Sequence, residues 1–320
     1  MIMRLVSIGT LICAAACANT GANGGGGGDD TPAPDAATGG SSGEDGAVAN
    51  AKPIIFTIVL ENKNDESILG SANAPYLNSL ITQGGLATNY KDTIHPSLGN
   101  YLNMISGANQ YPGVVDIGPE QFPYFPSSEQ HLGTQLVAAN IPWRAYQESM
   151  GTPCNLSTAG KYAPKHNPFI YFTDIQDAPN NLCASVDVDY SMFAADLASN
   201  AYRYMWITPN LDNDGHDPTN DPALGLRNAD AWMSHEVPKI LASEGFKANG
   251  ILFITWDEDE GGNNEKIPMI ILSPRVKQAG MTVDVALTHS SYLATIEDLL
   301  GLPRLATVTS TPSMMMFFTP

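Results

Sequence analysis

The chain has little positive charge and few cysteines. Its 320 residues include 15 Lys and Arg against 33 Asp and Glu, which gives a formal net charge of −18. Proteins that bind nucleic acid need Lys and Arg to neutralise the phosphates, so we expect no nucleic-acid partner. After residue 17, no apolar run reaches the roughly 20 residues that span a bilayer. These absences argue against a mature protein that spans a membrane or binds nucleic acid.

The first 17 residues have the layout of a bacterial signal peptide. Arg4 is followed by an apolar stretch that ends in small residues and Cys17. Residues 14–16 resemble the cleavage box of lipoproteins, although Ala14 replaces the usual Leu. Two outcomes stay open: lipidation of Cys17, which would tether the protein to a membrane, or ordinary cleavage and release. Both predict export, as a cell-envelope lipoprotein or as a secreted protein.

Residues 18–50 differ in composition from the rest of the chain. They hold 10 of the 29 glycines, with Ser, Pro and Asp and almost no apolar side chains. Such a segment cannot bury enough surface to fold, so we expect a disordered tether. No comparable composition recurs later, and the 43% of residues that are hydrophobic can form a sizeable core. Residues 51–320 are therefore expected to form one folded domain.

Two cysteines, Cys154 and Cys183, lie in the expected folded part. In an exported domain, two cysteines most simply form one disulfide. The competing interpretation is a metal site, but the two residues lack the CxxC spacing that is typical of one. We therefore expect a disulfide between Cys154 and Cys183.

Strand-like and helix-like segments alternate along residues 51–320. The run IIFTIVL (54–60) is typical of a strand buried on both faces, and an amphipathic helix is expected from Pro75 to the glycines at 84 and 85. Further strands are expected at 204–208, 251–256 and 269–272, and further helices at 129–139, 228–243 and 290–300. This alternation predicts an α/β fold with a central, mainly parallel sheet flanked by helices.

Polar residues follow three of the expected strands. Glu61 and Asn62 come after the first strand, PNLDNDGHD follows 204–208, and DEDEGG follows 251–256. Ligands of open α/β sheets bind at the carboxyl ends of the strands. We therefore expect oxygen ligands and a histidine to meet at one edge of the sheet.

The segment DTIHPSLGNYLNMISG (92–107) predicts a helix that begins at Ser97. Pro96 disfavours helix at His95, and apolar residues then recur at helical spacing up to Ser106. At a helix N-terminus, unpaired N–H groups and the helix dipole favour anions. Ser97 could simply cap the helix, or it could be a nucleophile whose phosphate is stabilised there; the two roles can coincide.

Five segments, in this order, resemble the bacterial phosphoesterase family of acid phosphatases, phosphatidylinositol-3-phosphatases and phospholipase C enzymes, within the alkaline phosphatase superfamily. They are VLENK (59–63), HPSLGNYLNMISG (95–107), KHNPFIYF (165–172), WDEDEGG (256–262) and THSSYLATIEDLLGL (288–302). The resemblance covers nearly all of 53–305 and implies an alkaline phosphatase-like catalytic domain at 51–320. It implies that Ser97 becomes phosphorylated and that Asn100 holds a phosphate oxygen. Gly99 stands where the family usually has Pro.

The resemblance also implies one or two divalent metal ions. An oxygen-rich site is expected from Glu61, Asn62, Ser97, Asp257 and Glu258. Oxygen donors suit Mg, Ca or Mn better than Zn. A second ion, with Zn as a candidate, is expected at Asp212, His216 and His289 by similarity to two-metal relatives.

Residues 210–221 allow a different interpretation. Asn210, Asp212, Asp214, Gly215 and Asp221 follow calcium-loop spacing, but Pro209 and a strand-like run precede them where an EF-hand needs a helix.

Three further residues are expected to contact substrate. By resemblance, His166 contacts the phosphate or the leaving group, and Lys165 adds positive charge beside it. His95 adjoins the proposed nucleophile and is expected to support it or to carry a proton.

Together these features predict a metal-dependent phosphomonoesterase that acts through a phosphoserine on a small phosphate ester or a phospholipid head group. One alternative is a phospholipase C, with Tyr111, Phe122, Tyr124 and Phe125 as residues that could meet lipid. Another is a catalytically silent, metal-binding surface lipoprotein. The apolar end at 314–318 is expected to dock on the body of the protein or on a neighbour.

Overall fold

The computed structural model describes residues 52–108, 115–121, 125, 130–216, 221, 223–261 and 265–319. The expected signal peptide, Cys17 and the expected tether lie outside these residues. All described residues belong to one compact unit, Gly43–Pro320.

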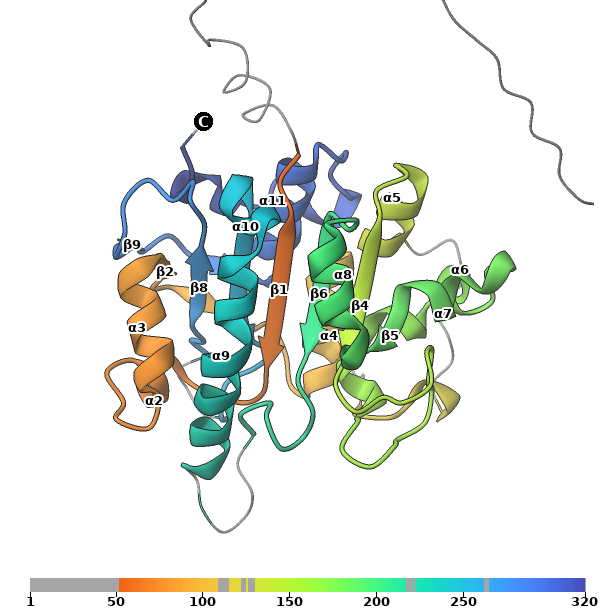
Figure 1. Ribbon diagram of the computed structural model, residues 1–320, viewed down its shortest axis with the longest axis horizontal. Coiled ribbons are helices and arrows are strands. Elements are labelled where there is room, and N and C mark those ends of the chain that lie inside the picture. Colours follow the sequence, from red (N-terminus) through yellow and green to blue (C-terminus); the bar gives the residue numbers. More distant parts are fainter. Residues whose placement is uncertain are drawn as a thin grey trace, which may run out of the picture. The chain divides into compact units, whose positions relative to one another are not determined.

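Within the described residues, an eight-stranded sheet forms the centre of this unit, in the order β5-β4-β6-β1-β7-β8-β2-β9 (Figure 1). The strands from β5 to β7 in this order are parallel, whereas β8 runs antiparallel to both β7 and β2. The expected mainly parallel sheet is confirmed. The strands are β1 (Ile55–Leu60), β2 (Gly85–Ala87), β4 (Trp143–Gln147), β5 (Asp187–Asp189), β6 (Tyr204–Thr208), β7 (Ile251–Trp256), β8 (Met269–Leu272) and β9 (Met281–Val283), with β3 (Tyr90–Lys91) and β10 (Leu287–Thr288) in a separate two-stranded sheet.

The expected strands at 54–60, 204–208, 251–256 and 269–272 correspond to β1, β6, β7 and β8. Every residue of β1 and β7 is buried, as a strand covered on both faces requires. The short strands β2, β4, β5 and β9 were not predicted. They have only three to five residues, and β4 (WRAYQ) and β5 (DVD) carry polar side chains.

Helices cover both faces of the sheet. The hydroxyl of Thr57 lies 2.6 Å from the Tyr292 hydroxyl of α11, whereas the ring of Phe56 faces Phe246 of α10, with centroids 6.5 Å apart. Successive strand residues point to opposite faces, so α11 and α10 lie on opposite sides. Helix α4 packs with α11, and α3 and α9 lie on the side of α10 (Figure 1).

The α-helices are α2 (Asp65–Ile68), α3 (Pro75–Gln83), α4 (Ser97–Ser106), α5 (Leu132–Ala138), α6 (Thr173–Gln176), α7 (Leu182–Val186), α8 (Phe193–Ser199), α9 (Leu224–Ala242), α10 (Glu244–Asn249) and α11 (His289–Leu300). The 3-10 turns are η1 (Pro119–Gln121), η2 (Pro164–His166), η3 (Pro168–Tyr171), η4 (Pro179–Asn181), η5 (Tyr190–Met192), η6 (Ala306–Val308) and η7 (Met314–Phe317). No helix among the described residues is both long and apolar enough to cross a membrane.

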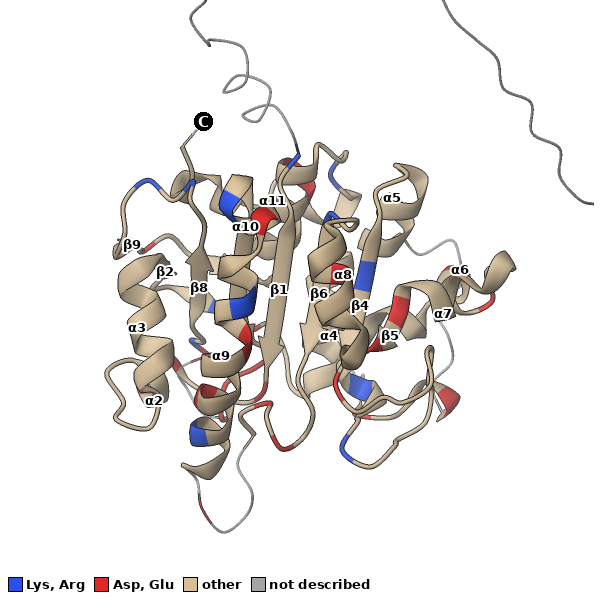
Figure 2. Ribbon diagram, viewed as in Figure 1, with Lys and Arg blue, Asp and Glu red and all other residues tan. Residues whose placement is uncertain are grey.

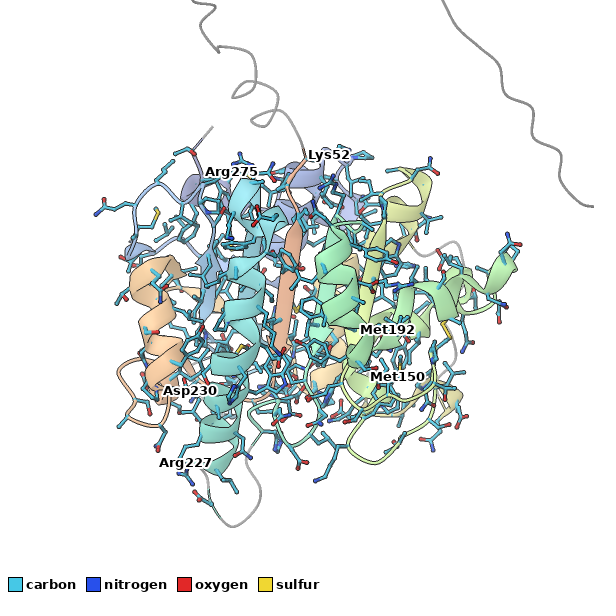
Figure 3. The ribbon with its side chains drawn as sticks, in the orientation of Figure 1. Lys52, Met150, Met192, Arg227, Asp230 and Arg275 are labelled. Atoms are coloured by element: carbon cyan, nitrogen blue, oxygen red, sulfur yellow. A yellow bond between two sulfur atoms is a disulfide. The ribbon has the colours of Figure 1, made fainter. Side chains whose placement is uncertain are left out.

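Specific contacts hold the helices at their positions. Asp230 of α9 accepts the backbone N–H groups of Tyr76 and Leu77 and so satisfies the first turn of α3 (Figure 3). Gly84 follows the last residue of α3 and lies close to β8. Only glycine fits there, because a Cβ would lie 2.2 Å from the carbonyl oxygen of Ile271. The two ends of α3 are thereby bound to α9 and β8.

The expected disulfide is present between Cys154 and Cys183, with the two Cα atoms 5.5 Å apart. It joins the loop after β4 to α7, directly before β5. The C-terminal segment docks on the body of the protein: Met314 and Phe317 are fully buried, and the ring of Phe318 lies 6.4 Å from that of Phe253.

Candidate active site

Acidic side chains gather at the carboxyl ends of β1 and β7 (Figure 2). Leu60 pairs with Trp256 at the end of the two strands, and the Asp257 N–H donates to the Leu60 carbonyl at 2.9 Å. This register places the residues that follow the two strands side by side. We call Glu61, Asn62, Ser97, Asp257 and Glu258 the carboxyl-edge cluster.

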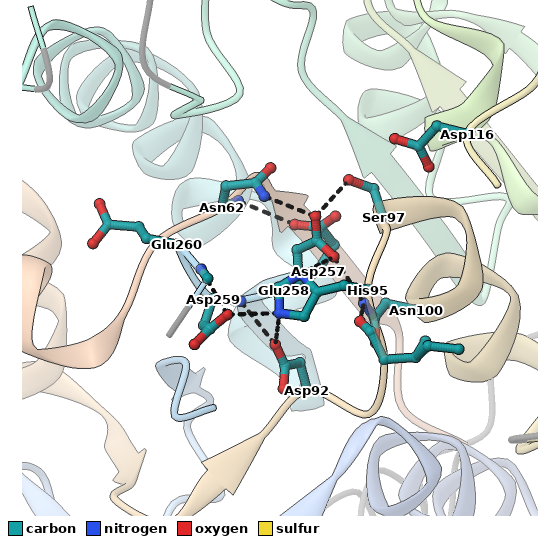
Figure 4. Close-up of polar contacts among 12 residues, drawn as sticks. Asn62, Asp92, His95, Ser97, Asn100, Asp116, Asp257, Glu258, Asp259 and Glu260 are labelled. Carbon is teal, nitrogen blue, oxygen red and sulfur yellow. Dashed lines mark hydrogen bonds and ion pairs between the residues drawn. The ribbon is translucent and has the colours of Figure 1, made fainter. Parts of the chain in front are cut away.

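The hydroxyl of Ser97 points into this cluster (Figure 4). Ser97 is the first residue of α4, and its Oγ lies 3.1 Å from Glu258 Oε1 and 3.3 Å from Glu61 Oε2. The residue in the N-cap position is Pro96, whose side chain makes no capping hydrogen bond. The Ser97 hydroxyl therefore hydrogen-bonds the carboxylates of Glu61 and Glu258 and does not cap the helix.

Asn62 links the two strand ends. Its N–H donates to Asp257 Oδ1 at 3.1 Å, and its Nδ2 donates to Glu258 Oε1 at 2.8 Å. Asn62 has a φ of 39°, and the buried Lys63 ammonium donates to its carbonyl at 3.0 Å. Asn62 Oδ1 and Asp257 Oδ2 are buried acceptors without a hydrogen-bond partner among the described residues. Each of these oxygens is therefore available to accept from a ligand or to coordinate a cation.

The electrostatics of the cluster also fit a cation. Burial raises the pKa of the Glu61 carboxyl well above its ordinary value, and the charges of Asp257 and Asp214 raise it further. Burial and the charge of Glu258 likewise raise the pKa of Asp257. Three adjoining buried carboxylates repel one another unless protons or a cation neutralise them. The donor set of carboxylates, an amide oxygen and a hydroxyl matches a hard divalent ion.

Asn100 joins α4 to the segment that precedes it. Its Oδ1 accepts the N–H and hydroxyl of Thr93, both at 3.1 Å, and its Nδ2 donates to the Ile94 carbonyl. The same Nδ2 lies 3.4 Å from Glu258 Oε2, at the border of the cluster. The Ile94 side chain fills the space beside Gly99, where a Cβ would lie 2.8 Å from Ile94 Cγ2.

His166 and Lys165 reach the cluster from η2. His166 Nε2 lies 3.2 Å from Glu61 Oε1, and its ring stacks on Tyr101, whose hydroxyl donates to the same oxygen at 2.8 Å. Burial lowers the pKa of His166 well below its ordinary value, and the charges of Lys165 and His216 lower it further. Lys165 pairs with Asp116, and its pKa is raised: burial lowers it, but Glu61 and Asp116 outweigh that effect.

The profile of the Phosphoesterase family matches residues 62–303. The chain belongs to the phosphoesterase family. This membership makes the protein a hydrolase that acts on phosphate esters, as the sequence predicts.

Curated relatives of this phosphoesterase are phosphatases by name. Over 272 residues it is 27% identical to the phosphatidylinositol-3-phosphatase of Mycobacterium tuberculosis, which covers 83% of this chain and 84% of that protein. It is 29% identical to the phosphate-repressible acid phosphatase of Penicillium chrysogenum, over 81% of this chain but only 62% of that protein.

Solved structures show the alkaline phosphatase-like fold. A protein of the alkaline phosphatase superfamily from Vibrio parahaemolyticus matches with a TM-score of 0.57 at 15% identity, over 85% of this chain and 71% of that one. The PsFucS1 sulfatase from Pseudoalteromonas matches with a TM-score of 0.55 at 11% identity, over 85% and 73% of the two chains.

The structure of the phosphoesterase does not bring Asp212, His216 and His289 together as a second metal site. Asp212 pairs at the surface with Lys161, at 2.6 Å. His289 is fully buried; its Nε2 lies 2.6 Å from the Asp257 carbonyl, and its Nδ1 lies 2.9 Å from the Tyr90 hydroxyl. The carbonyl can only accept, so Nε2 carries the proton and Nδ1 accepts from Tyr90. His289 has no lone pair left for a metal and instead positions Asp257.

Asp214, which the sequence pointed to only through the calcium-loop spacing at 210–221, faces the cluster in place of Asp212. Its carbonyl accepts the Glu61 N–H at 2.7 Å, and its buried Oδ2 has no hydrogen-bond partner among the described residues. Burial raises the pKa of Asp214 to about 7. The Gly215 that follows has a φ of 97°, so a tight Asp-Gly turn was the available signal. The strand β6, rather than the helix of an EF-hand, precedes this loop.

His95 lies at the outer side of the cluster, beside a group of acids that sequence reasoning missed. Its Nδ1 lies 2.8 Å from Glu258 Oε2 and its Nε2 lies 2.7 Å from Asp259 Oδ1. Among the described residues, the acids and histidines able to hold an ion with ligand atoms within 4.8 Å of one another are Asp92, His95 and Asp259. As it stands, His95 bridges two carboxylates, and Asp259 also accepts the N–H groups of Gly261 and Glu265.

Proposed function

We propose that this phosphoesterase is a metal-dependent phosphomonoesterase of the acid phosphatase type and that Ser97 is its nucleophile. The observation that carries the proposal is the buried Ser97 hydroxyl, which meets Glu61 and Glu258 beside the two unpaired oxygens of Asn62 and Asp257. This position, at hydrogen-bond distance from two carboxylates, is the one that a serine nucleophile needs if a carboxylate is to take its proton.

The five residues of the carboxyl-edge cluster would hold one divalent ion, with Mg, Ca or Mn favoured by the oxygen donors. When bound, such an ion lowers the pKa of a hydroxyl and neutralises charge on phosphate oxygens. Asp214 and His166 adjoin Glu61. They would be the candidate ligands of a second ion, in place of the expected set of Asp212, His216 and His289.

The chain's own residues account for two chemical steps. The Ser97 oxygen attacks phosphorus in line while its proton passes to the Glu258 or Glu61 carboxylate that accepts its hydrogen bond. The Ser–O–P bond forms as the ester P–O bond breaks, and the leaving alcohol takes a proton from a water molecule, which becomes hydroxide. This hydroxide attacks the phosphorus of the phosphoserine, the Ser–O–P bond breaks, and the Ser97 oxygen takes back its proton from the glutamate carboxyl as hydrogen phosphate is released. Lys165 and the N–H groups at the start of α4 face the negative oxygens.

The substrate class that we propose is a small phosphate monoester or a monoester on a lipid head group, since both a phosphatidylinositol-3-phosphatase and acid phosphatases are relatives. For the phospholipase C alternative, Tyr111, Phe122 and Tyr124 lie outside the described residues, and Phe125 packs on Phe172 with ring centroids 5.1 Å apart. Of these four aromatic residues, the one that the structure describes therefore packs against the hydrophobic core of the protein rather than offering a lipid-facing side chain. Export, with or without lipidation at Cys17, is part of the proposal, and the disulfide supports it.

Substitution of the nucleophile tests this proposal. Ser97→Ala is expected to lower kcat/KM for p-nitrophenyl phosphate by roughly 1000-fold or more, because the covalent step is lost. Ser106→Ala is the matched control: Ser106 is a buried serine on the same helix whose hydroxyl bonds the Leu102 carbonyl. Quenched turnover of the wild type should trap phosphate on Ser97. Full activity of Ser97→Ala would refute the mechanism, and release of phosphocholine from phosphatidylcholine would favour the phospholipase.

A further inference from the structure

Asp116 occupies a position in the active site that neither the sequence motifs nor the proposed mechanism explains. It lies in the segment 115–121, and Figure 4 shows it beside Ser97. Its Oδ1 accepts the backbone N–H of Leu98, at 3.0 Å, and its Oδ2 pairs with the Lys165 ammonium. One carboxylate therefore engages both the first turn of α4 and the lysine of η2.

These two donors are the ones that a substrate phosphate would use. Free N–H groups at a helix N-terminus and a lysine ammonium are typical phosphate-binding groups. The carboxyl-edge cluster beside these donors is itself acidic, so it offers no positive charge to a phosphate in the absence of a cation. An incoming phosphate thus finds its donors already bound to an anion of the protein.

The position of Asp116 is built into the fold. The carbonyl of the next residue, Ile117, accepts the hydroxyl of Tyr171 at 2.6 Å, and Tyr171 is fully buried. Further along, the Gln121 N–H donates to the Gly118 carbonyl at 3.0 Å. The backbone around Asp116 is therefore held independently of its contacts with Leu98 and Lys165.

We propose that the Asp116 carboxylate occupies the phosphate position of the ligand-free enzyme, competes with phosphate for Leu98 and Lys165, and so sets the phosphate affinity of the site. The inference rests on the proposed function. Substrate phosphate must displace the carboxylate, which raises KM, and the returning carboxylate helps to expel the product orthophosphate, an anion that binds the same donors. Asp116 thus determines affinity without taking part in bond formation.

Asp116→Asn tests the competition because it removes the charge and keeps the shape. In the presence of MnCl₂, we expect orthophosphate to bind this variant roughly tenfold tighter by calorimetry, the scale of one charged hydrogen bond. Its inhibition constant against p-nitrophenyl phosphate and the KM should fall by a similar factor. The control is Glu120→Gln, which removes the same charge in the same segment from a carboxylate that bonds Ser157 and touches neither α4 nor Lys165. Glu120→Gln should change neither constant by more than about twofold.

Unchanged or weaker phosphate binding by Asp116→Asn would overturn the inference, because Asp116 would then be inert or would position Lys165. A structure of the wild-type enzyme with orthophosphate and Mn²⁺ gives a second test that needs no variant. The Asp116 carboxylate should have left Leu98 and Lys165, and bound phosphate beside an intact Asp116–Leu98 bond would refute the inference. A folded wild type that binds no orthophosphate would defeat the proposed function as well, whereas wild-type binding that Asp116→Asn leaves unaltered defeats the inference alone.

Discussion

Two buried polar groups, one in the middle of strand β1 and one just after it, differ in how fully their atoms are hydrogen-bonded. At mid-strand, the Thr57 hydroxyl lies 2.6 Å from that of Tyr292, which lies 2.9 Å from that of Tyr204; we call these three residues the mid-sheet network. Just after the strand, the carboxyl-edge cluster leaves two buried oxygens unpaired among the described residues. The hydrogen-bonded mid-sheet network holds α11 on the sheet. The unpaired oxygens of the carboxyl-edge cluster cost stability in the absence of a ligand, and a bound ligand would remove that cost.

Among the changes considered, metal removal should show the largest difference between the carboxyl-edge cluster and the mid-sheet network. We expect chelation to lower kcat/KM for p-nitrophenyl phosphate by roughly 1000-fold, since a catalytic divalent ion supplies several kcal/mol of transition-state stabilisation. Adding back Mg²⁺, Ca²⁺ or Mn²⁺ should restore activity and raise Tm through linkage. The shift in Tm should persist in Tyr292→Phe, which leaves the cluster intact. Full activity after exhaustive chelation would contradict the metal assignment.

The buried polar pair of Asp187 and Asn167 should make the stability of the protein depend on pH. Burial raises the pKa of Asp187 to about 7, although hydrogen bonds from Asn167 lower it, whereas an unfolded Asp titrates near 4. Between about pH 4 and 7 the folded protein keeps a proton that the unfolded chain has lost. Its contribution to stability is therefore complete below about pH 4 and is lost as the pH rises to 7, by on the order of 4 kcal/mol.

The Asp187→Asn variant should remove most of this pH dependence. Both Asp187 oxygens contact Asn167 Nδ2, so an asparagine here keeps one oxygen that accepts from Asn167 and has no carboxyl proton to lose. Urea unfolding at pH 5 and pH 8 would measure the difference for both proteins. If the free energy of unfolding changes equally between pH 5 and pH 8 in the variant and the wild type, another group is responsible for the pH dependence.

Glu61→Gln should stabilise the metal-free protein while abolishing metal binding. The substitution removes one of several mutually repelling buried carboxylates, so we expect the free energy of unfolding in chelator at pH 8 to rise by about 1–3 kcal/mol. The increase in Tm on adding Mn²⁺ should disappear. A matched urea titration of Tyr292→Phe in chelator supplies the contrast. A destabilised Glu61→Gln protein would indicate that the cluster is satisfied without a cation.

Tyr292→Phe should have the smallest effect and the opposite pattern. It leaves the Thr57 and Tyr204 hydroxyls without their shared partner, which should cost about 1–2 kcal/mol of stability. Activity and metal-induced stabilisation should stay within about twofold of wild type, because no atom of the cluster is changed. Loss of activity beyond the loss of folded protein would mean that the two regions are coupled.

The sequence predicts the centre of the fold well because its interior strands are continuous, largely apolar runs. It does not reveal that β8 runs antiparallel, since strand direction depends on how the chain returns to the sheet. The strands β4 and β5 were missed because short polar segments at the side of a sheet carry little hydrophobic signal.

Within the site, residues that directly follow strands were predicted and residues on distant loops were not. Glu61, Asp257 and Glu258 are found together because parallel neighbours end at the same edge. The choice of Asp214 over Asp212 depends on the turn at Gly215, and the role of His289 depends on Tyr90, 199 residues away. Asp116 has no motif at all, because its importance comes from Leu98 and Lys165.

Hydrophobic runs and strand-end acids in the sequence alone thus predict the layers of the sheet and the edge at which chemistry is expected, because hydrophobic runs, their periodicity and the polar residues that follow them are local properties of the chain. Tertiary structure decided which polar atoms are paired and which are open. Pairing depends on distances of about 3 Å between groups that lie dozens of residues apart, and no local pattern encodes those distances.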